Sequence, residues 1–139
     1  MSVKKSCFVA ALLTTMSVTL TVAQAKRGKT LSSGGWGGTH IQLTVANGSA
    51  SIEYDCATGT IDGPLKVDSR GRFDWRGKHV REHGGPVRIN ENSEAERTRY
   101  TGWTDGKRMK LTVILIDSKT TVGTFELTRA SEGRVFKCR

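Results

Sequence analysis

The sequence predicts an all-β protein, a small antiparallel meander barrel of seven or eight strands with one disulfide. Apolar and polar residues alternate along most of the chain after residue 39, which is the period of a strand with one buried face. Turn-forming sequences recur near the spacing of about 8 to 12 residues that is typical of sandwiches and barrels. No stretch shows the period of an amphipathic helix.

The first 25 residues have the composition of a secretory signal peptide. Lys4 and Lys5 precede an apolar run from Phe8 to Val22, and Ala23-Gln24-Ala25 has the small-x-small pattern of a cleavage site. Hydroxyl residues interrupt the run and Lys26-Arg27 follows it directly, which favours processing over a membrane anchor. We therefore expect a secreted or periplasmic protein.

Removal of residues 1–25 leaves 114 of the 139 residues, the usual size of one domain. The removed segment holds two lysines and no acid, so the formal net charge falls from +9 to +7. We expect residues 26–39 to be a flexible glycine-rich segment and residues 40–139 to form a single β-barrel domain. No second apolar run approaches the roughly 20 residues of a transmembrane helix.

Two of the three cysteines remain after processing, because Cys7 lies in the signal segment. In an exported domain Cys56 and Cys138 most simply form a disulfide that ties down the C-terminal strand. Closing so long a loop stabilises the fold by about 4 kcal/mol in the chain-entropy model. The alternative is a thiol that acts as a ligand or nucleophile.

The first strands are predicted over residues 40–45 and 50–56. Asn47-Gly48 lies between them and is a strong two-residue hairpin signal. Residues 58–67 form a weaker extended segment that Gly63-Pro64 interrupts.

Further strands follow, and the last of them can close the sheet. They are predicted around Phe73 and Trp75, over residues 100–104, 109–115 and 123–128, and over residues 135–138.

One segment imitates a metal site. His79-Val80-Arg81-Glu82-His83 has the spacing of inverted zinc peptidases, which hold both imidazoles on one helix turn. Gly77 and Gly84-Gly85 flank it too closely for that helix. In a strand the two histidines would lie roughly 13 Å apart, too far to share one ion. We therefore predict neither a metal nor a cofactor.

Three aromatic residues are candidates to line a ligand pocket: Trp75, Trp103 and Tyr54. The alternative is that they fill the core, because the interior of a small barrel is either filled or just wide enough for one ligand. Glu82 and His83 lie in a glycine-rich loop where a carboxylate can orient an imidazole. The alternative there is a wide solvated turn.

Cations recur at alternate positions on two predicted strands. Arg70, Arg72, Arg76 and Lys78 form one series, and Arg97, Arg99, Arg108 and Lys110 form the other. Such a surface attracts anionic polymers, with Arg72 and Arg76 as the central candidates. The alternative is a solvated outer face whose charges guard against edge pairing.

Six short stretches together resemble a family of small uncharacterised exported bacterial proteins. They are Trp36-Gly37-Gly38, Ile52 to Cys56 with Gly59 to Pro64, the loop Glu82-His83-Gly84-Gly85-Pro86, and Gly123-Thr124-Phe125 before Lys137-Cys138. The resemblance implies a shared fold and no activity. A weaker architectural likeness to lipocalin and avidin barrels rests on strand count and Gly-Trp-Gly, and it implies no ligand.

The sequence therefore predicts an exported non-enzymatic binding protein. Its partner is a small ligand in the barrel mouth or an anionic envelope component. The alternative is a protein that binds a macromolecule or inhibits a hydrolase. A metal-dependent hydrolase comes third, because no nucleophile elbow or paired-carboxylate motif is visible.

Overall fold

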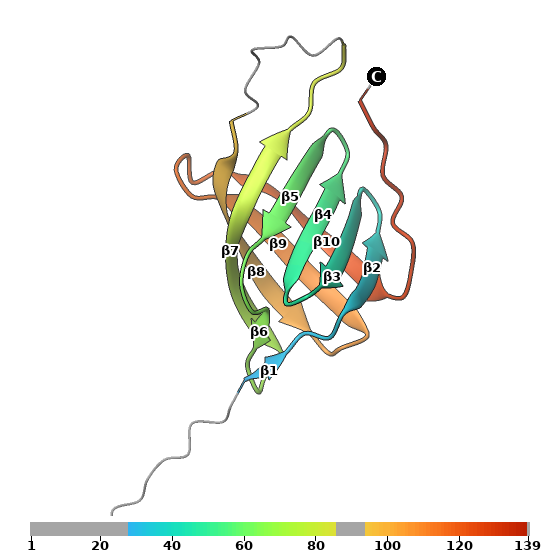
Figure 1. The fold of residues 1–139 in the computed structure, drawn as a ribbon, viewed down its shortest axis with the longest axis vertical. Helices are drawn as coiled ribbons and strands as arrows, with labels where there is room; N and C mark the ends of the chain where they lie inside the picture. The colour runs from blue at the N-terminus through green and yellow to red at the C-terminus, as the bar shows by residue number, and fades with distance from the viewer. Residues whose placement is uncertain (1–27, 86–93, 139) are drawn as a thin grey trace, which may run out of the picture.

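The computed structural model describes residues 28–85 and 94–138, and eight antiparallel strands within them close into a barrel (Figure 1). The predicted all-β meander barrel with one disulfide is confirmed. The strands are β1 (Lys29–Thr30), β2 (Gly34–Gly38), β3 (Ile41–Ala46), β4 (Ser49–Tyr54), β5 (Ala57–Ile61), β6 (Lys66–Val67), β7 (Arg72–Arg81), β8 (Glu96–Thr104), β9 (Arg108–Leu115) and β10 (Thr121–Arg129). The predicted signal segment lies outside the described residues. The described part of the chain contains no helix that could cross a membrane.

Strands that are adjacent in the chain are adjacent in the barrel, in the order β10-β2-β3-β4-β5-β7-β8-β9. β1 and β6 pair separately and lie at the lower end in Figure 1. The barrel closes where β10 meets β2, and this pairing joins only Leu127–Arg129 to Trp36–Gly38. The rest of β10 pairs with β9 alone within the described chain. The upper part of this seam is therefore open.

Side chains fill the lower and middle parts of the barrel. Alternation along β3 places Ile41, Leu43 and Val45 inside, as the two-residue period predicts. Trp36 and Tyr100 are fully buried at the centre. Leu31, Leu65 and Val67 are also buried, and the indole N–H of Trp75 donates to the carbonyl of Lys66, 2.9 Å away. The lower end of the barrel is thus closed by core residues.

The expectation of a flexible segment over residues 26–39 is wrong for Gly34–Gly38, which forms β2. Trp36 from this strand is fully buried in the core. The barrel therefore begins at Gly34 and not at residue 40. Four glycines carry no side chains, so the segment lacks the alternation that marks the other strands.

The predicted C-terminal strand over residues 135–138 is also wrong. Residues 131–138, which we call the C-terminal tail, make one isolated bridge, between Arg134 and Thr39. The tail rises past β2 at the right of Figure 1. It ends at the disulfide between Cys138 and Cys56, whose Cα atoms are 4.9 Å apart. β2, and not this segment, closes the sheet.

Candidate functional site

A cavity of about 430 Å³ lies at the upper end of the barrel, which we call the mouth. The β2–β3 turn, the β4–β5 turn and the start of β10 meet there, beside the open part of the seam. The cavity is lined by His40, Tyr54, Asp55, Cys56, Ala57, His79, Arg81, Thr120, Thr121, Val122 and Phe125. Its volume falls within the range of about 300 to 1,000 Å³ that is typical of small-molecule sites. The barrel is therefore filled below and hollow at the mouth.

Three aromatic rings meet at the floor of the mouth. The ring centroid of Tyr54 lies 5.4 Å from that of His79 and 5.6 Å from that of Phe125. Tyr54 and His79 are each only 3% exposed. Gly59 leaves room for the tyrosine rings, because a Cβ there would lie 3.2 Å from Cε2 of Tyr54 and 2.6 Å from the hydroxyl of Tyr100. These contacts fix the position of the polar atoms that the rings carry.

The hydroxyl of Tyr54 and both ring nitrogens of His79 are buried and form no hydrogen bond of normal geometry among the described residues, although, besides burial, the Tyr100 hydroxyl lies close enough to Tyr54 to help raise its pKa. By contrast, the neighbouring Tyr100 hydroxyl donates to the carbonyl of Lys78 over 2.8 Å. A buried polar group without a partner costs about 1 to 3 kcal/mol, so proteins seldom keep one without a use. Both residues line the cavity, and their polar atoms lie just beneath its surface.

The charge state of His79 follows from its surroundings. Burial lowers the imidazole pKa below its ordinary value of 6.5, and the nearby Arg81 lowers it further. Glu96 opposes this shift, with a carboxylate oxygen 3.8 Å from Nδ1 of His79. The neutral imidazole offers one donor and one acceptor. Burial also holds the Tyr54 pKa well above its ordinary value, so the phenol stays protonated.

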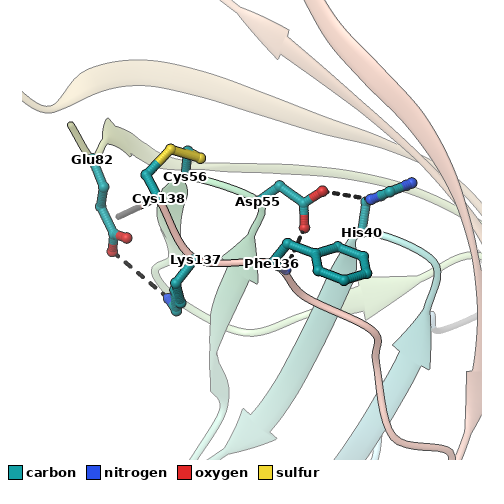
Figure 2. Close-up of a disulfide and its surroundings, with 7 residues drawn as sticks. All are labelled: His40, Asp55, Cys56, Glu82, Phe136, Lys137 and Cys138. Carbon is teal, nitrogen blue, oxygen red and sulfur yellow. Dashed lines mark hydrogen bonds and ion pairs between the residues drawn. A yellow bond between two sulfur atoms is a disulfide. The ribbon is translucent and has the colours of Figure 1, made fainter. Parts of the chain in front are cut away.

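His40 and Asp55 form the outer rim of the mouth (Figure 2). Nδ1 of His40 lies 2.5 Å from a carboxylate oxygen of Asp55, and the other oxygen accepts the Phe136 backbone N–H over 2.7 Å. These bonds lower the Asp55 pKa, the Phe136 amide contributing most. The ring of Phe136 lies beside His40. Cys56 follows Asp55, so the disulfide holds the tail against this rim.

The structure brings only part of the predicted site together. Tyr54 lines the mouth. Trp75 is buried at the lower end and stacks on Phe73, so the alternative of a core residue holds. Trp103 is not a barrel-interior residue, because it faces outward and is 42% exposed. Its neighbours Tyr100 and Thr104 take the inward positions of β8.

Glu82 and His83 do not line the mouth cavity among the described residues. Glu82 lies beside the tail, with an oxygen 3.8 Å from Nζ of Lys137. Residues 86–93, which include Pro86 of the predicted glycine-rich loop, lie outside the described residues. The zinc-peptidase spacing has no helix to support it, since β7 extends to Arg81. The described residues contain no cluster of three or more His, Cys, Asp or Glu suited to a metal ion.

The predicted cations Arg72 and Arg76 lie exposed on the outer face of β7. In the β7–β8 register Arg76 is directly opposite Arg99, and Lys78 is directly opposite Arg97. Asp74 pairs with Arg99, with the shorter contact at 2.5 Å, and Asp117 pairs with Arg97. Arg72 and Arg76 help to lower the pKa values of Asp68 and Asp74, but Arg72, Arg76 and Lys78 form no close ion pair within the described residues. The face is therefore basic and only partly neutralised.

No protein-family model, curated protein or solved structure matches the chain. The resemblance to small exported bacterial proteins therefore stays a prediction.

Proposed function

We propose that the protein is an exported, non-enzymatic binding protein that takes a small ligand in the mouth of its barrel. The observation that carries this proposal is the pair of buried residues at the floor, Tyr54 and His79, whose polar atoms form no hydrogen bond of normal geometry among the described residues. They lie in a cavity of suitable size and between apolar walls from Phe125 and Val122. The export that the signal segment and the disulfide favour is part of the same proposal.

The chemistry of the floor narrows the ligand class. A neutral imidazole and a phenol together present donors and acceptors without net charge. The surrounding rings favour a flat molecule that can pack against them. Arg81 and Asp55 line the cavity with opposite charges, so neither sign dominates it. The mouth therefore suits a small, uncharged ring compound with adjacent donor and acceptor groups.

The experiment compares the variants Tyr54→Phe and Tyr100→Phe. Loss of the Tyr54 hydroxyl, which forms no hydrogen bond of normal geometry, should stabilise the free protein by about 1 kcal/mol and weaken ligand binding by about five- to tenfold. Loss of the Tyr100 hydroxyl should instead destabilise the protein by about 1 kcal/mol, because that hydroxyl is already bonded. Thermal unfolding measures the first effect. Titration of a library of small phenols and heterocycles, followed by NMR shifts of Tyr54 and His79, measures the second.

Two results would count against a ligand in the mouth. One is a library in which no compound moves the Tyr54 or His79 resonances, together with native mass spectra that show no bound molecule after purification from the exporting cell. The other is equal loss of stability in both tyrosine variants. Either result would show that the mouth is only the solvated end of the core and not a ligand site.

A second candidate function, the binding of an anionic polymer, is favoured by the cross-strand pairs on β7 and β8. Arg76 faces Arg99 and Lys78 faces Arg97, and only Arg99 and Arg97 are paired with carboxylates, those of Asp74 and Asp117. An anionic polymer could neutralise the remaining cations. The basic face and the mouth are separate surfaces, so the two functions can be tested independently.

A further inference from the structure

A second cavity, which we call the outer groove, lies on the outside of the barrel and has a volume of about 660 Å³. Trp103 of β8 and the C-terminal tail, through Ser131, Glu132 and Arg134, line it together with outward residues of β9 and β10. The strands β8, β9, β10 and β2 lie side by side, so β8 and β2 are roughly 14 Å apart. That width accommodates an extended chain rather than a single small molecule.

Trp103 has a fixed orientation in this groove. Its indole N–H donates to the carbonyl of Arg70, 3.0 Å away. Gly71 lies against the ring, and a Cβ there would come within 2.8 Å of the indole nitrogen. The side chain is nevertheless 42% exposed, whereas Trp36 and Trp75 are buried. An aromatic surface that is already immobilised loses little entropy when a partner packs on it.

The groove carries charges of both signs, with Arg108, Lys110 and Arg134 beside Glu126 and Glu132. Arg108 lies 3.7 Å from a carboxylate oxygen of Asp105. Lys110 and Glu126 are cross-strand partners in the β9–β10 register, yet they form no ion pair within the described residues. Glu132 and Arg134 likewise form no side-chain ion pair there. Thr128 and Ser131 add hydroxyls. The groove thus offers many donors and acceptors with little net charge, unlike the basic face of β7 and β8.

We infer that the outer groove binds a neutral polysaccharide, with a sugar ring stacked on Trp103. The C–H groups on the face of a pyranose carry partial positive charge and pack against the negative face of an indole. Sugar hydroxyls both donate and accept, so the carboxylate of Glu126 and the cationic groups of Lys110 and Arg134 can bind one chain. A polyanion would meet repulsion from Glu126 and Glu132 as well as attraction to the cations, whereas a neutral chain can use both kinds of group as hydrogen-bond partners. The inference does not depend on a ligand in the mouth.

The test uses cello-, chito-, xylo- and malto-oligosaccharides as probes, with affinity measured by calorimetric titration of the full mature chain. At least one series should bind. Trp103→Ala should lower the affinity by at least about tenfold, and Glu126→Gln by about fivefold. Phe136→Ala is the matched control, because Phe136 is an exposed aromatic residue of the tail that does not line the groove. Its affinity should equal that of the wild type.

Added salt should leave the affinity nearly unchanged, since the probes carry no charge. The inference fails if none of the four series binds, or if a folded Trp103→Ala variant binds as tightly as the wild type. A protein partner that requires Trp103, found without any glycan binding, would also overturn it. If Trp103→Ala does not fold, Lys110→Gln and Glu126→Gln provide the same test, because these exposed side chains support no described contact.

Discussion

His79 occupies an interior position where an apolar side chain would fill the same space at lower cost. Its imidazole is 3% exposed, and neither nitrogen has a hydrogen-bond partner among the described residues. Burial disfavours the charged ring more strongly than the nearby Glu96 favours it, so its pKa lies below 6.5. The residue therefore couples the stability of the barrel to pH. It also keeps a neutral donor and acceptor at the floor of the mouth.

We predict that the protein loses stability as the pH falls below about 6.5, the pKa of an unfolded histidine. In this range the unfolded chain takes up a proton that folded His79 resists, so the slope is positive in pH and at most about 1.4 kcal/mol per unit. The loss ends near the folded pKa. In the variant His79→Gln, unfolding temperatures measured between about pH 5 and pH 7 should show a flatter dependence.

The carboxylates do not contribute to the change in stability between about pH 5 and pH 7. Asp55 and Asp74 have lowered pKa values, Asp55 mainly through the Phe136 amide and Asp74 mainly through Arg99. Their contribution to stability is complete above their ordinary pKa of 3.8 and is lost only as the pH falls further. An unchanged slope in His79→Gln would show that another group causes the dependence. Direct NMR titration of His79 gives the folded pKa independently.

The alternation of the sequence predicts which way the side chains of His79 and Trp103 face. His79 shares the parity of Phe73 and Trp75, which face inward, so its burial follows from the strand period. Trp103 has the opposite parity to Tyr100, so it faces outward. The absence of a partner for His79 could not be predicted, because it depends on which side chains other strands bring to the mouth.

Among the elements, the tail depends on one glycine for its position. Gly37 faces outward on β2, and a Cβ there would collide with the backbone of Ser131 and Glu132. Gly133 in the tail donates in turn to the side-chain oxygen of Gln42, 2.5 Å away. Close backbone approach of this kind requires the absence of a side chain. The contact between Gly37 and the tail therefore helps to position both the wall of the outer groove and the rim of the mouth, because the tail contributes to each.

We predict that Gly37→Ala destabilises the protein by about 1 to 3 kcal/mol, because the tail backbone has to move away from β2. Gly35→Ala is the matched control on the same face of the same strand. A Cβ at Gly35 meets only the flexible side chain of Gln42, at 3.4 Å, so this change should be neutral or slightly stabilising. Denaturant unfolding compares the two. Equal effects would show that the tail does not depend on Gly37.

β2 also shows where prediction of an element from sequence ends. The hairpin of β3 and β4 is encoded locally, by alternation and by Asn47-Gly48. β2 consists of one tryptophan among four glycines, and its strand conformation is imposed by pairing with β3 and β10. The tail is likewise held by contacts with distant residues and by Cys56. Neither β2 nor the tail has a local sequence pattern that predicts its conformation.

For the whole molecule, the distribution of charge separates three surfaces. The mouth and the outer groove contain both signs in similar number, whereas on the outer face of β7 and β8 the cations outnumber Asp74, and Arg72, Arg76 and Lys78 form no close ion pair in the described chain. The expected mature chain has a net charge of +7, so some attraction to anions is general. A specific basic site has to bind more strongly than this background.

We predict that heparin retains the protein and that Arg72→Gln with Arg76→Gln lowers the eluting salt concentration more than a control pair does. The control is Lys107→Gln with Lys119→Gln, which removes the same net charge from exposed turns far from β7 in sequence. The physical reason is local. Arg72 and Arg76 lie on one face of β7, and Arg76 is directly opposite Arg99, so these cations release counterions together when a polymer binds. Equal shifts for both pairs would reduce the basic face to a solvated surface that prevents aggregation. A larger shift for the β7 pair, with neutral-glycan binding unchanged in the same variant, would establish two independent polymer surfaces on one barrel.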